Sequence, residues 1–208
     1  MNEEIVAAIQ ARTTSERFPE KVLHNFLKPG QTMLHKMVRT IESCGLNWVI
    51  LTPNNKEQAP IGNLFFKTYA PAVLEIDVLG RYYEWAKKHS VKHIMRLTGD
   101  CPLISKYIIL QLIKEYKKDD GKVYWGTDTY ETVPDGLDVE IFPFFMLEAA
   151  NEKAKSSEER EHVTSYLKLN FPYKRYTTKH NFRGLKLSVD TKDDLERTEE
   201  WSKIFQND

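Results

Sequence analysis

Residues 5–21 read IVAAIQARTTSERFPEK and join a short apolar run to an abruptly polar loop. Ile5 to Ile9 is too short for a helix, and a continuous β-branched run is typical of a strand buried on both faces. The loop carries three cations, Arg12, Arg17 and Lys21, among three hydroxyl side chains. Open α/β sheets bind ligands at the carboxyl ends of their strands, and arginine and lysine suit phosphate oxygens. The stretch predicts a polyphosphate-binding loop, although a solvated loop whose cations pair with its own glutamates, Glu16 and Glu20, stays open.

Composition limits the class of protein. A chain of 208 residues can bury one sizeable core, so we expect a single domain over residues 1–208. Lys plus Arg and Asp plus Glu number 30 each, so bulk charge favours neither nucleic acid nor an acidic membrane surface. The two cysteines are too few for a disulfide framework, and the N-terminus lacks a signal pattern. These observations predict a cytoplasmic protein that binds neither nucleic acid nor membrane.

Strand and helix patterns alternate after the loop. Helical spacing at 33–41, 78–90 and 104–116 alternates with short apolar runs at 48–51, 93–97 and 123–125. Such alternation indicates βαβ units and a mainly parallel sheet, hence an α/β fold. The later part predicts strands at 139–142, 174–179 and 185–189, and helices at 144–155, from Ser156 to about Leu169, and after Thr191.

Six blocks resemble, in order, the sugar cytidylyltransferases. The first is the loop pattern Ile9-x-Ala11-Arg12-x-x-Ser15-x-Arg17-x-Pro19-x-Lys21, which looks like the nucleotide-binding signature of that superfamily. The others are Asp77–Tyr83, Arg96–Leu103, Pro134–Glu140, Arg160–Thr164 and Leu187–Asp194. The superfamily includes the CMP-KDO and CMP-sialic acid synthetases, and the chain most resembles the SpsF-like branch associated with spore-coat polysaccharide synthesis.

The resemblance implies both a fold and a reaction. The fold would be a single-domain, three-layer nucleotide-diphospho-sugar-transferase-like α/β fold with a mainly parallel sheet. The reaction would move a cytidylyl group from CTP to an anionic sugar-like acceptor and release pyrophosphate, in surface polysaccharide or glycan precursor synthesis. The expected partners are CTP and this acceptor, with a homodimer also open.

The resemblance also assigns nucleotide and metal ligands. The residues that would bind the nucleotide are Ala11, Arg12, Ser15, Arg17, Lys21 and Thr98. Asp100 follows the predicted strand 93–97 at the same sheet edge as the loop, where a carboxylate can hold Mg²⁺ together with phosphate oxygens. Asp190 is the second metal candidate. Each aspartate also suits a helix N-cap, an alternative that residue types leave open.

The segment Pro134–Glu140 is expected on the acceptor side. Asp138 and Glu140 share one face if the chain is extended. By resemblance the segment, with Asp135, would bind the sugar, and Asp138 could take the proton of the acceptor hydroxyl. Together with Arg12, Lys21 and Asp100, Asp138 makes up the expected catalytic set. A turn leading into a half-exposed strand is the alternative.

Three further residues are candidates for binding an anionic acceptor. The resemblance implies that Arg160 and His162 face the acceptor, whereas their early helical position also suits solvated surface. Arg96, within a predicted strand, is either an acceptor-side cation or the partner of Glu140. Cations mixed with hydroxyl-binding carboxylates fit a nonulosonic acid or a sugar phosphate.

The chain departs from the family pattern in three places. Glu20 stands where the family commonly has Gly, Gly80 stands where Asp is usual, and the stretch 53–76 is shortened, with a trimmed helix and strand expected there. These departures keep open a non-catalytic nucleotide-binding homologue. A nucleotide-sugar-dependent glycosyltransferase is the other alternative, but it would need an Asp-x-Asp motif, which the sequence around Asp128 lacks.

Overall fold

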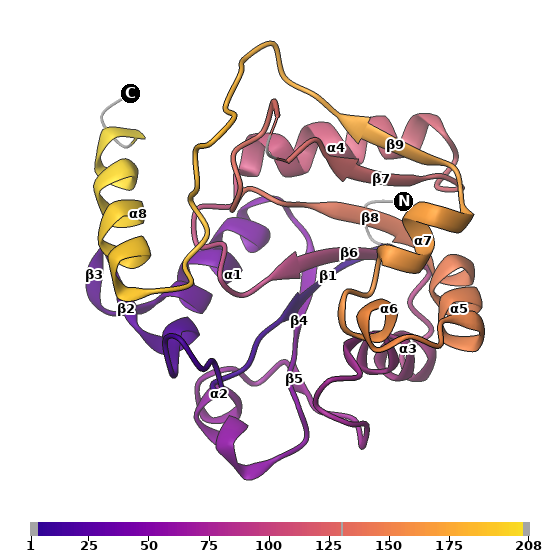
Figure 1. Ribbon diagram of the computed structural model, residues 1–208, viewed down its shortest axis with the longest axis horizontal. Helices are drawn as coiled ribbons and strands as arrows, with labels where there is room; N and C mark the ends of the chain where they lie inside the picture. Colours follow the sequence, from indigo (N-terminus) through magenta and orange to yellow (C-terminus); the bar gives the residue numbers. More distant parts are fainter. Residues whose placement is uncertain (1–3, 130, 206–208) are drawn as a thin grey trace.

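Strand β1 (Ile5–Gln10) lies inside a seven-stranded sheet with the order β5-β4-β1-β6-β8-β7-β9 (Figure 1). It pairs in parallel with β4 (Asn47–Leu51) and with β6 (His93–Thr98). Ile5, Ala7, Ala8 and Ile9 are fully buried, as the apolar run predicts. The computed structural model describes residues 4–129 and 131–205; residues 1–3, 130 and 206–208 of the expected 1–208 domain lie outside this description.

The rest of the sheet is mainly parallel. β5 (Thr68–Tyr69) is parallel to β4, and β9 (Tyr173–Tyr176) is parallel to β7 (Tyr124–Thr127). β8 (Glu140–Pro143) runs antiparallel to both β6 and β7. The expected single-domain α/β fold is therefore confirmed.

Helices cover both faces of the sheet and give three layers. One face packs against α1 (Met33–Ser43), α2 (Ala59–Leu64) and α4 (Lys106–Lys118). The other packs against α3 (Val78–Lys88), α5 (Phe144–Lys153) and α7 (Ser165–Asn170). The 53–76 stretch contains η3 (Lys56–Gln58), α2 and β5, so it is the expected short helix and strand.

A third, small core holds the C-terminal helix. Val189 and Leu195 pack with Phe26 and Met33. This cluster fastens α8 (Lys192–Phe205) to the region of the hairpin formed by β2 (Asn25–Phe26) and β3 (Lys28–Thr32), which follows η2 (Lys21–Leu23). It places the segment before α8 beside the loop that follows β1. Within the described part of the chain, none of the helices has the length and apolar character needed to cross a bilayer.

Two predicted elements are wrong. The helix expected to about Leu169 divides into α6 (Ser157–Glu161) and α7, because Val163 adopts a left-handed φ of 47° and the chain turns there. Residues 185–189 form no strand; they make one isolated bridge to Asp135 and a backbone hydrogen bond from Val189 to Asp100. Their backbone partners lie in loops, so no ladder can extend.

Candidate active site

Two cavities meet at the sheet edge where β1 and β6 end. The loop cavity, about 790 Å³, is lined by the loop after β1, by residues before and within α3, and by Glu161 and His162. The sheet cavity, about 520 Å³, lies over β6, β8, β7 and β9. Thr98, Asp100 and Asp190 line both. A molecule in one cavity can therefore meet a molecule in the other at these three residues.

The loop after β1 presents its cations to the loop cavity. Arg17 Nη2 lies 3.0 Å from Asp190 Oδ1, and Arg12 Nη1 lies 3.7 Å from Glu75 Oε1. Both side chains are exposed and line the cavity together with Ala11 and Ser15. Their ion pairs are thus with residues from distant parts of the chain, not with the loop's own glutamates.

The loop hydroxyls divide between structure and cavity. Thr13 is buried and donates to the Glu57 carbonyl oxygen at 2.7 Å, while Thr14 donates to Glu75 Oε1 at 2.5 Å. These bonds fix the loop to its neighbours. Of the three hydroxyls, only that of Ser15 belongs to a residue that lines the cavity.

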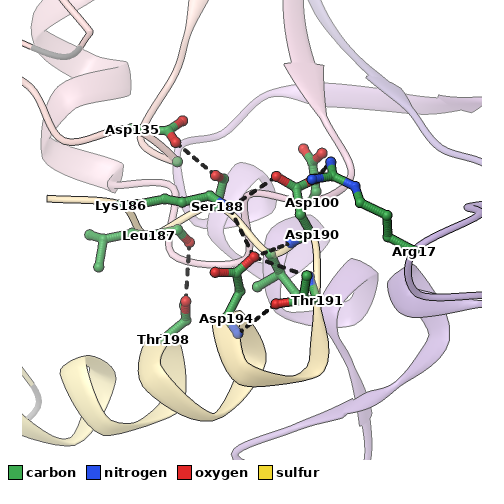
Figure 2. A network of polar contacts seen from close by, with 12 residues as sticks. Arg17, Asp100, Asp135, Lys186, Leu187, Ser188, Asp190, Thr191, Asp194 and Thr198 are labelled. Carbon is green, nitrogen blue, oxygen red and sulfur yellow. Dashed lines mark hydrogen bonds and ion pairs between the residues drawn. The ribbon is translucent and has the colours of Figure 1, made fainter. Parts of the chain in front are cut away.

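Lys21 lies at the junction of the two cavities. Its Nζ donates to Asp100 Oδ2 at 3.2 Å, to Asp190 Oδ1 at 3.1 Å and to the Val189 carbonyl oxygen at 2.7 Å. The side chain is only 12% exposed. Figure 2 shows Asp100 and Asp190 beside the guanidinium of Arg17. Two carboxylates that lie 90 residues apart in the sequence, Asp100 and Asp190, therefore converge on Lys21.

Neither aspartate caps a helix, so the capping alternative is wrong for both. Ser105 caps α4 by accepting from the Ile108 amide. Thr191 caps α8, because its hydroxyl accepts from the Asp194 amide while Asp194 Oδ2 accepts from the Thr191 amide (Figure 2). Asp194 also accepts from the Asp190 amide and from Lys186, and in this way fixes the backbone of Asp190.

The donor set at the junction suits Mg²⁺. Among residues 4–129 and 131–205, no three His, Cys, Asp or Glu side chains come together as a metal site. Mg²⁺ needs only one or two protein carboxylates when phosphate oxygens and water complete its shell. Burial alone would raise the pKa of Asp190, but its bonds to Lys186 and Lys21 hold that pKa below the usual value. Asp190 could thus hold the ion as a carboxylate.

Asp138 is the best candidate for a base in the sheet cavity. Its carboxylate accepts from Thr129 Oγ1 at 2.6 Å and from the Gly136 amide at 2.9 Å. Burial raises its pKa, although both hydrogen bonds act in the opposite direction. A raised pKa makes a carboxylate a stronger proton acceptor near neutral pH. Asp135 also lines this cavity and accepts from Ser188 Oγ at 2.9 Å (Figure 2).

Arg96 and Glu140 pair with each other, and both residues also line the sheet cavity. Arg96 Nη1 donates to Glu140 Oε2 at 2.6 Å, and Lys168 Nζ lies 2.9 Å from Glu140 Oε1. The hydroxyls of Tyr124 and Thr164 also donate to Glu140. Burial would raise the pKa of Glu140, but Arg96 and Lys168 hold it below the usual value. With its oxygens engaged, Glu140 holds cations in place; because it also lines the sheet cavity, its expected role of fixing a sugar hydroxyl stays a prediction.

Arg160 lines neither cavity, so the structure gives its expected acceptor role no support. Its Nε and Nη2 donate to Asp77 Oδ1 and Oδ2 at 2.8 and 2.7 Å, and the guanidinium also bonds Asn151. A Cβ at Gly80 would lie 2.4 Å from Asp77 Oδ2. Glycine at this position therefore makes room for the ion pair, which explains one departure from the family pattern. His162 is exposed and lines the loop cavity, not the sheet cavity.

We expect Arg160→Met to lower the free energy of unfolding by about 1–3 kcal/mol, because Asp77 would lose a part-buried charged partner. Calorimetric binding of CTP should not change, since Arg160 lies outside both cavities. Lys155→Met is the matched control, because Lys155 is exposed nearby and bonds only local groups. If Arg160→Met unfolds at the same temperature as the wild-type protein but loses turnover, Arg160 binds the acceptor after all.

The helix break at Val163 brings its neighbours to the site. A left-handed φ in a β-branched residue is an outlier that costs energy. It turns Thr164 toward Glu140 and leaves His162 at the loop cavity. Glu20 also has a left-handed φ, 55°, which is why glycine suits that position in the family.

Several cavity residues escape sequence reasoning. Arg81 lies within the block Asp77–Tyr83, so its position in the pattern could have identified it. Lys168, Tyr173 and Arg175 lie outside all six blocks and no sequence signal marks them. Their place in the sheet cavity depends on how β9 and α7 pack.

Sequence comparison identifies the family. The chain matches the family model described as cytidylyltransferase over residues 6–208. It is also 33% identical over 213 residues to an uncharacterized protein of Methanocaldococcus jannaschii, covering 97% of this chain and 84% of that protein.

Solved structures agree with this family. A cytidylyltransferase from Leptospira borgpetersenii superposes with a TM-score of 0.88 at 26% identity, covering 98% of this chain and 88% of that one. A CMP:2-keto-3-deoxy-manno-octonic acid synthetase complexed with CTP gives a TM-score of 0.72 at 14% identity, with 97% and 99% covered, and supports the fold alone. The chain belongs to the cytidylyltransferase family.

Proposed function

We propose that the protein transfers a cytidylyl group from CTP to a hydroxyl of an anionic sugar, either a nonulosonic acid or a sugar phosphate, and releases pyrophosphate. The observation that carries this proposal is the meeting of the loop cavity and the sheet cavity at Thr98, Asp100 and Asp190. Family membership supports CTP as the nucleotide. A role in surface polysaccharide or glycan precursor synthesis, membership of the SpsF-like branch, a cytoplasmic location and a homodimer stay predictions.

In this mechanism each cavity holds one substrate. CTP lies in the loop cavity with its triphosphate along Arg12, Arg17 and Lys21. The acceptor hydroxyl in the sheet cavity attacks the α-phosphorus, the bond from this phosphorus to the β-phosphate oxygen breaks, and Asp138 takes the hydroxyl proton. Loop cations stabilise the charge that builds on the leaving pyrophosphate. Mg²⁺, held by Asp100 when bound, with Asp190 as second ligand, would neutralise further phosphate charge.

Loss of Lys21 should weaken nucleotide binding. We expect Lys21→Ala to reduce the free energy of CTP binding by about 1.5–3 kcal/mol, the range for a hydrogen bond to a charged group. Isothermal titration calorimetry measures this directly. Lys28→Ala is the control, because Lys28 is exposed on β3 and lines neither cavity. If Lys21→Ala binds CTP as tightly as the wild-type protein, the loop after β1 does not bind the triphosphate and this part of the proposal is wrong.

Two residues of the loop cavity support a preference for cytosine. Gln10 Oε1 and Arg81 Nε are buried and lack hydrogen-bond partners among the described residues, and both residues line this cavity. Once turned toward the cavity, these side chains supply one acceptor and one donor. Cytosine offers the complementary N4 donor and N3 acceptor, whereas uracil reverses both. Sites built to bond a polar group strongly reject analogues that lack it.

We therefore expect CTP to bind at least about tenfold more tightly than UTP in the same calorimetric titration. Gln10→Leu removes the hydrogen-bond acceptor Oε1, so it should reduce the difference in affinity between CTP and UTP. Equal affinity of the wild-type protein for CTP and UTP would contradict the proposed base recognition.

The two alternatives find no support in the described residues. Asp128 pairs with Arg175 at 3.3 Å. Its neighbours in the sequence are threonines, so the Asp-x-Asp metal motif expected of a glycosyltransferase is missing here. A non-catalytic homologue was suggested by Glu20 and Gly80, but neither replacement removes a residue that lines either cavity.

A further inference from the structure

The floor of the sheet cavity carries an ordered row of side chains across four strands. Strand register aligns Arg96 on β6 with Glu140 on β8, Glu140 with Gly126 on β7, and Gly126 with Arg175 on β9. A Cβ at Gly126 would lie 3.1 Å from the Tyr173 hydroxyl, so that ring occupies the space above the glycine. We call this set, Arg96, Glu140, Gly126 and Arg175, the inner row. It has an arginine at each end.

Lys168 adds a third cation to the inner row. It reaches from α7 to Glu140, and its Nζ lies 5.9 Å from the centroid of the Tyr173 ring. The guanidinium carbon of Arg175 lies 5.4 Å from the same centroid. Glu140 is the one carboxylate of the row and is shared by Arg96 and Lys168. The inner row together with Lys168 therefore carries an excess of positive charge.

The side chains change sign toward the sheet edge. Asp138 precedes Glu140 by two residues and Asp100 follows Arg96 by four, while Asp128, two residues after Gly126, pairs with Arg175 at 3.3 Å. All three line the sheet cavity, and Asp100 also lines the loop cavity. Two residues of a strand span about 7 Å. The end of the sheet cavity that meets the loop cavity thus holds Asp138 and Asp100, of which Asp100 pairs with Lys21, and the inner row with its cations lies about 7 Å deeper than Asp138.

We infer that the acceptor carries its anionic group across the molecule from the hydroxyl that reacts. An anion beside the reacting hydroxyl would face Asp100 and Asp138, whereas an anion at the far end would meet Lys168 and Arg175. A pentose or hexose with a phosphate or carboxylate on a carbon remote from the reacting one has this shape. A 2-keto sugar acid, whose carboxylate adjoins the reacting carbon, does not. The inference rests on the proposed function, which defines the reacting end as the end shared with CTP.

The test uses inorganic phosphate as the probe, titrated by calorimetry into protein already saturated with CTP. Because CTP then occupies the loop, phosphate reports only a second anion site. Wild-type protein should bind phosphate, and Lys168→Met and Arg175→Met should each weaken that binding about tenfold or more. Lys174→Met is the matched control, since Lys174 lies between Tyr173 and Arg175 on β9 but lines neither cavity and pairs with Asp119.

A crystal of the full chain soaked in tungstate, a heavy analogue of phosphate, locates the site. Anomalous density between Lys168 and Arg175 is the expected result. Density at the loop after β1 without density at the inner row would overturn the inference and leave the proposed function standing. Equal loss of phosphate binding in the Lys174 and Lys168 variants would overturn it as well. Failure of the wild-type protein to bind CTP would instead overturn the proposed function, and the inference with it.

Discussion

Asp138→Asn is expected to lower kcat for pyrophosphate release about 10²–10⁴-fold, the usual contribution of a general base. The asparagine keeps one oxygen that can accept a hydrogen bond from the Thr129 hydroxyl or the Gly136 amide, but it cannot take a proton. Asp135→Asn is the comparison within the same cavity, because Asp135 is bonded to Ser188 and has no assigned proton transfer. We expect that variant to change KM more than kcat.

The pH dependence separates a base from a structural carboxylate. Asp138 accepts a proton only when ionised, so wild-type kcat should fall as pH drops through a pKa that burial raises above its usual value. Asp138→Asn should lose this acid limb. A carboxyl whose pKa is higher in the folded than in the unfolded state stabilises the folded protein at low pH. That stabilisation is lost as pH rises from the unfolded-state pKa through the folded-state pKa. At neutral pH the variant should therefore be no less stable than wild type, and a destabilised variant that keeps its kcat would contradict the assignment.

Asp100→Asn is expected to lower metal-dependent turnover by at least about 100-fold. Replacing a residue that only hydrogen-bonds a metal ligand already lowers metal affinity or activity about 10–100-fold. The fold should persist, because Ser105 and not Asp100 caps α4. A second readout does not depend on activity: binding of Mn²⁺ in the presence of CTP, followed by electron paramagnetic resonance, should weaken in parallel.

Asp193→Asn is the matched control for Asp100→Asn. Asp193 is exposed in the first turn of α8 and lines neither cavity, so the same change of charge should leave turnover and Mn²⁺ binding unaltered. If Asp100→Asn unfolds at a clearly lower temperature while it keeps its activity, Asp100 has a structural role and the proposed metal site is wrong.

The loop cavity follows from local sequence, which is why the meeting of its residues could be predicted. A buried strand must end at the sheet edge, so the cations after β1 and Asp100 after β6 necessarily meet there. The metal candidate Asp190 comes from the other end of the chain, and its place depends on the small core that packs Val189 and Leu195 against Phe26. Only the family pattern indicated that it would lie beside Asp100.

The acceptor side depends on tertiary contacts that local patterns do not reveal. Arg160 finds its partner Asp77 eighty-three residues earlier in the chain, and that pair requires the space left by Gly80. The turn at Val163 interrupts a sequence with good helical signals because Thr164 bonds the buried Glu140. Lys168 and Arg175 reach the sheet cavity through the packing of α7 and the pairing of β9 with β7. Residue type alone predicted cations for the acceptor; of these Arg96 lines the sheet cavity, whereas Arg160 does not, and Lys168 and Arg175 were missed.

We propose above that the protein uses CTP to modify a hydroxyl and releases pyrophosphate. The most direct measurement is pyrophosphate release by the purified chain with CTP, Mg²⁺ and a pool of hexose phosphates, pentose phosphates, hexuronic acids and nonulosonic acids. We expect pyrophosphate release that requires both CTP and the pool and that is lost in Asp138→Asn. Tight binding of CTP without pyrophosphate release from any member of the pool, or equal release with UTP, would contradict it.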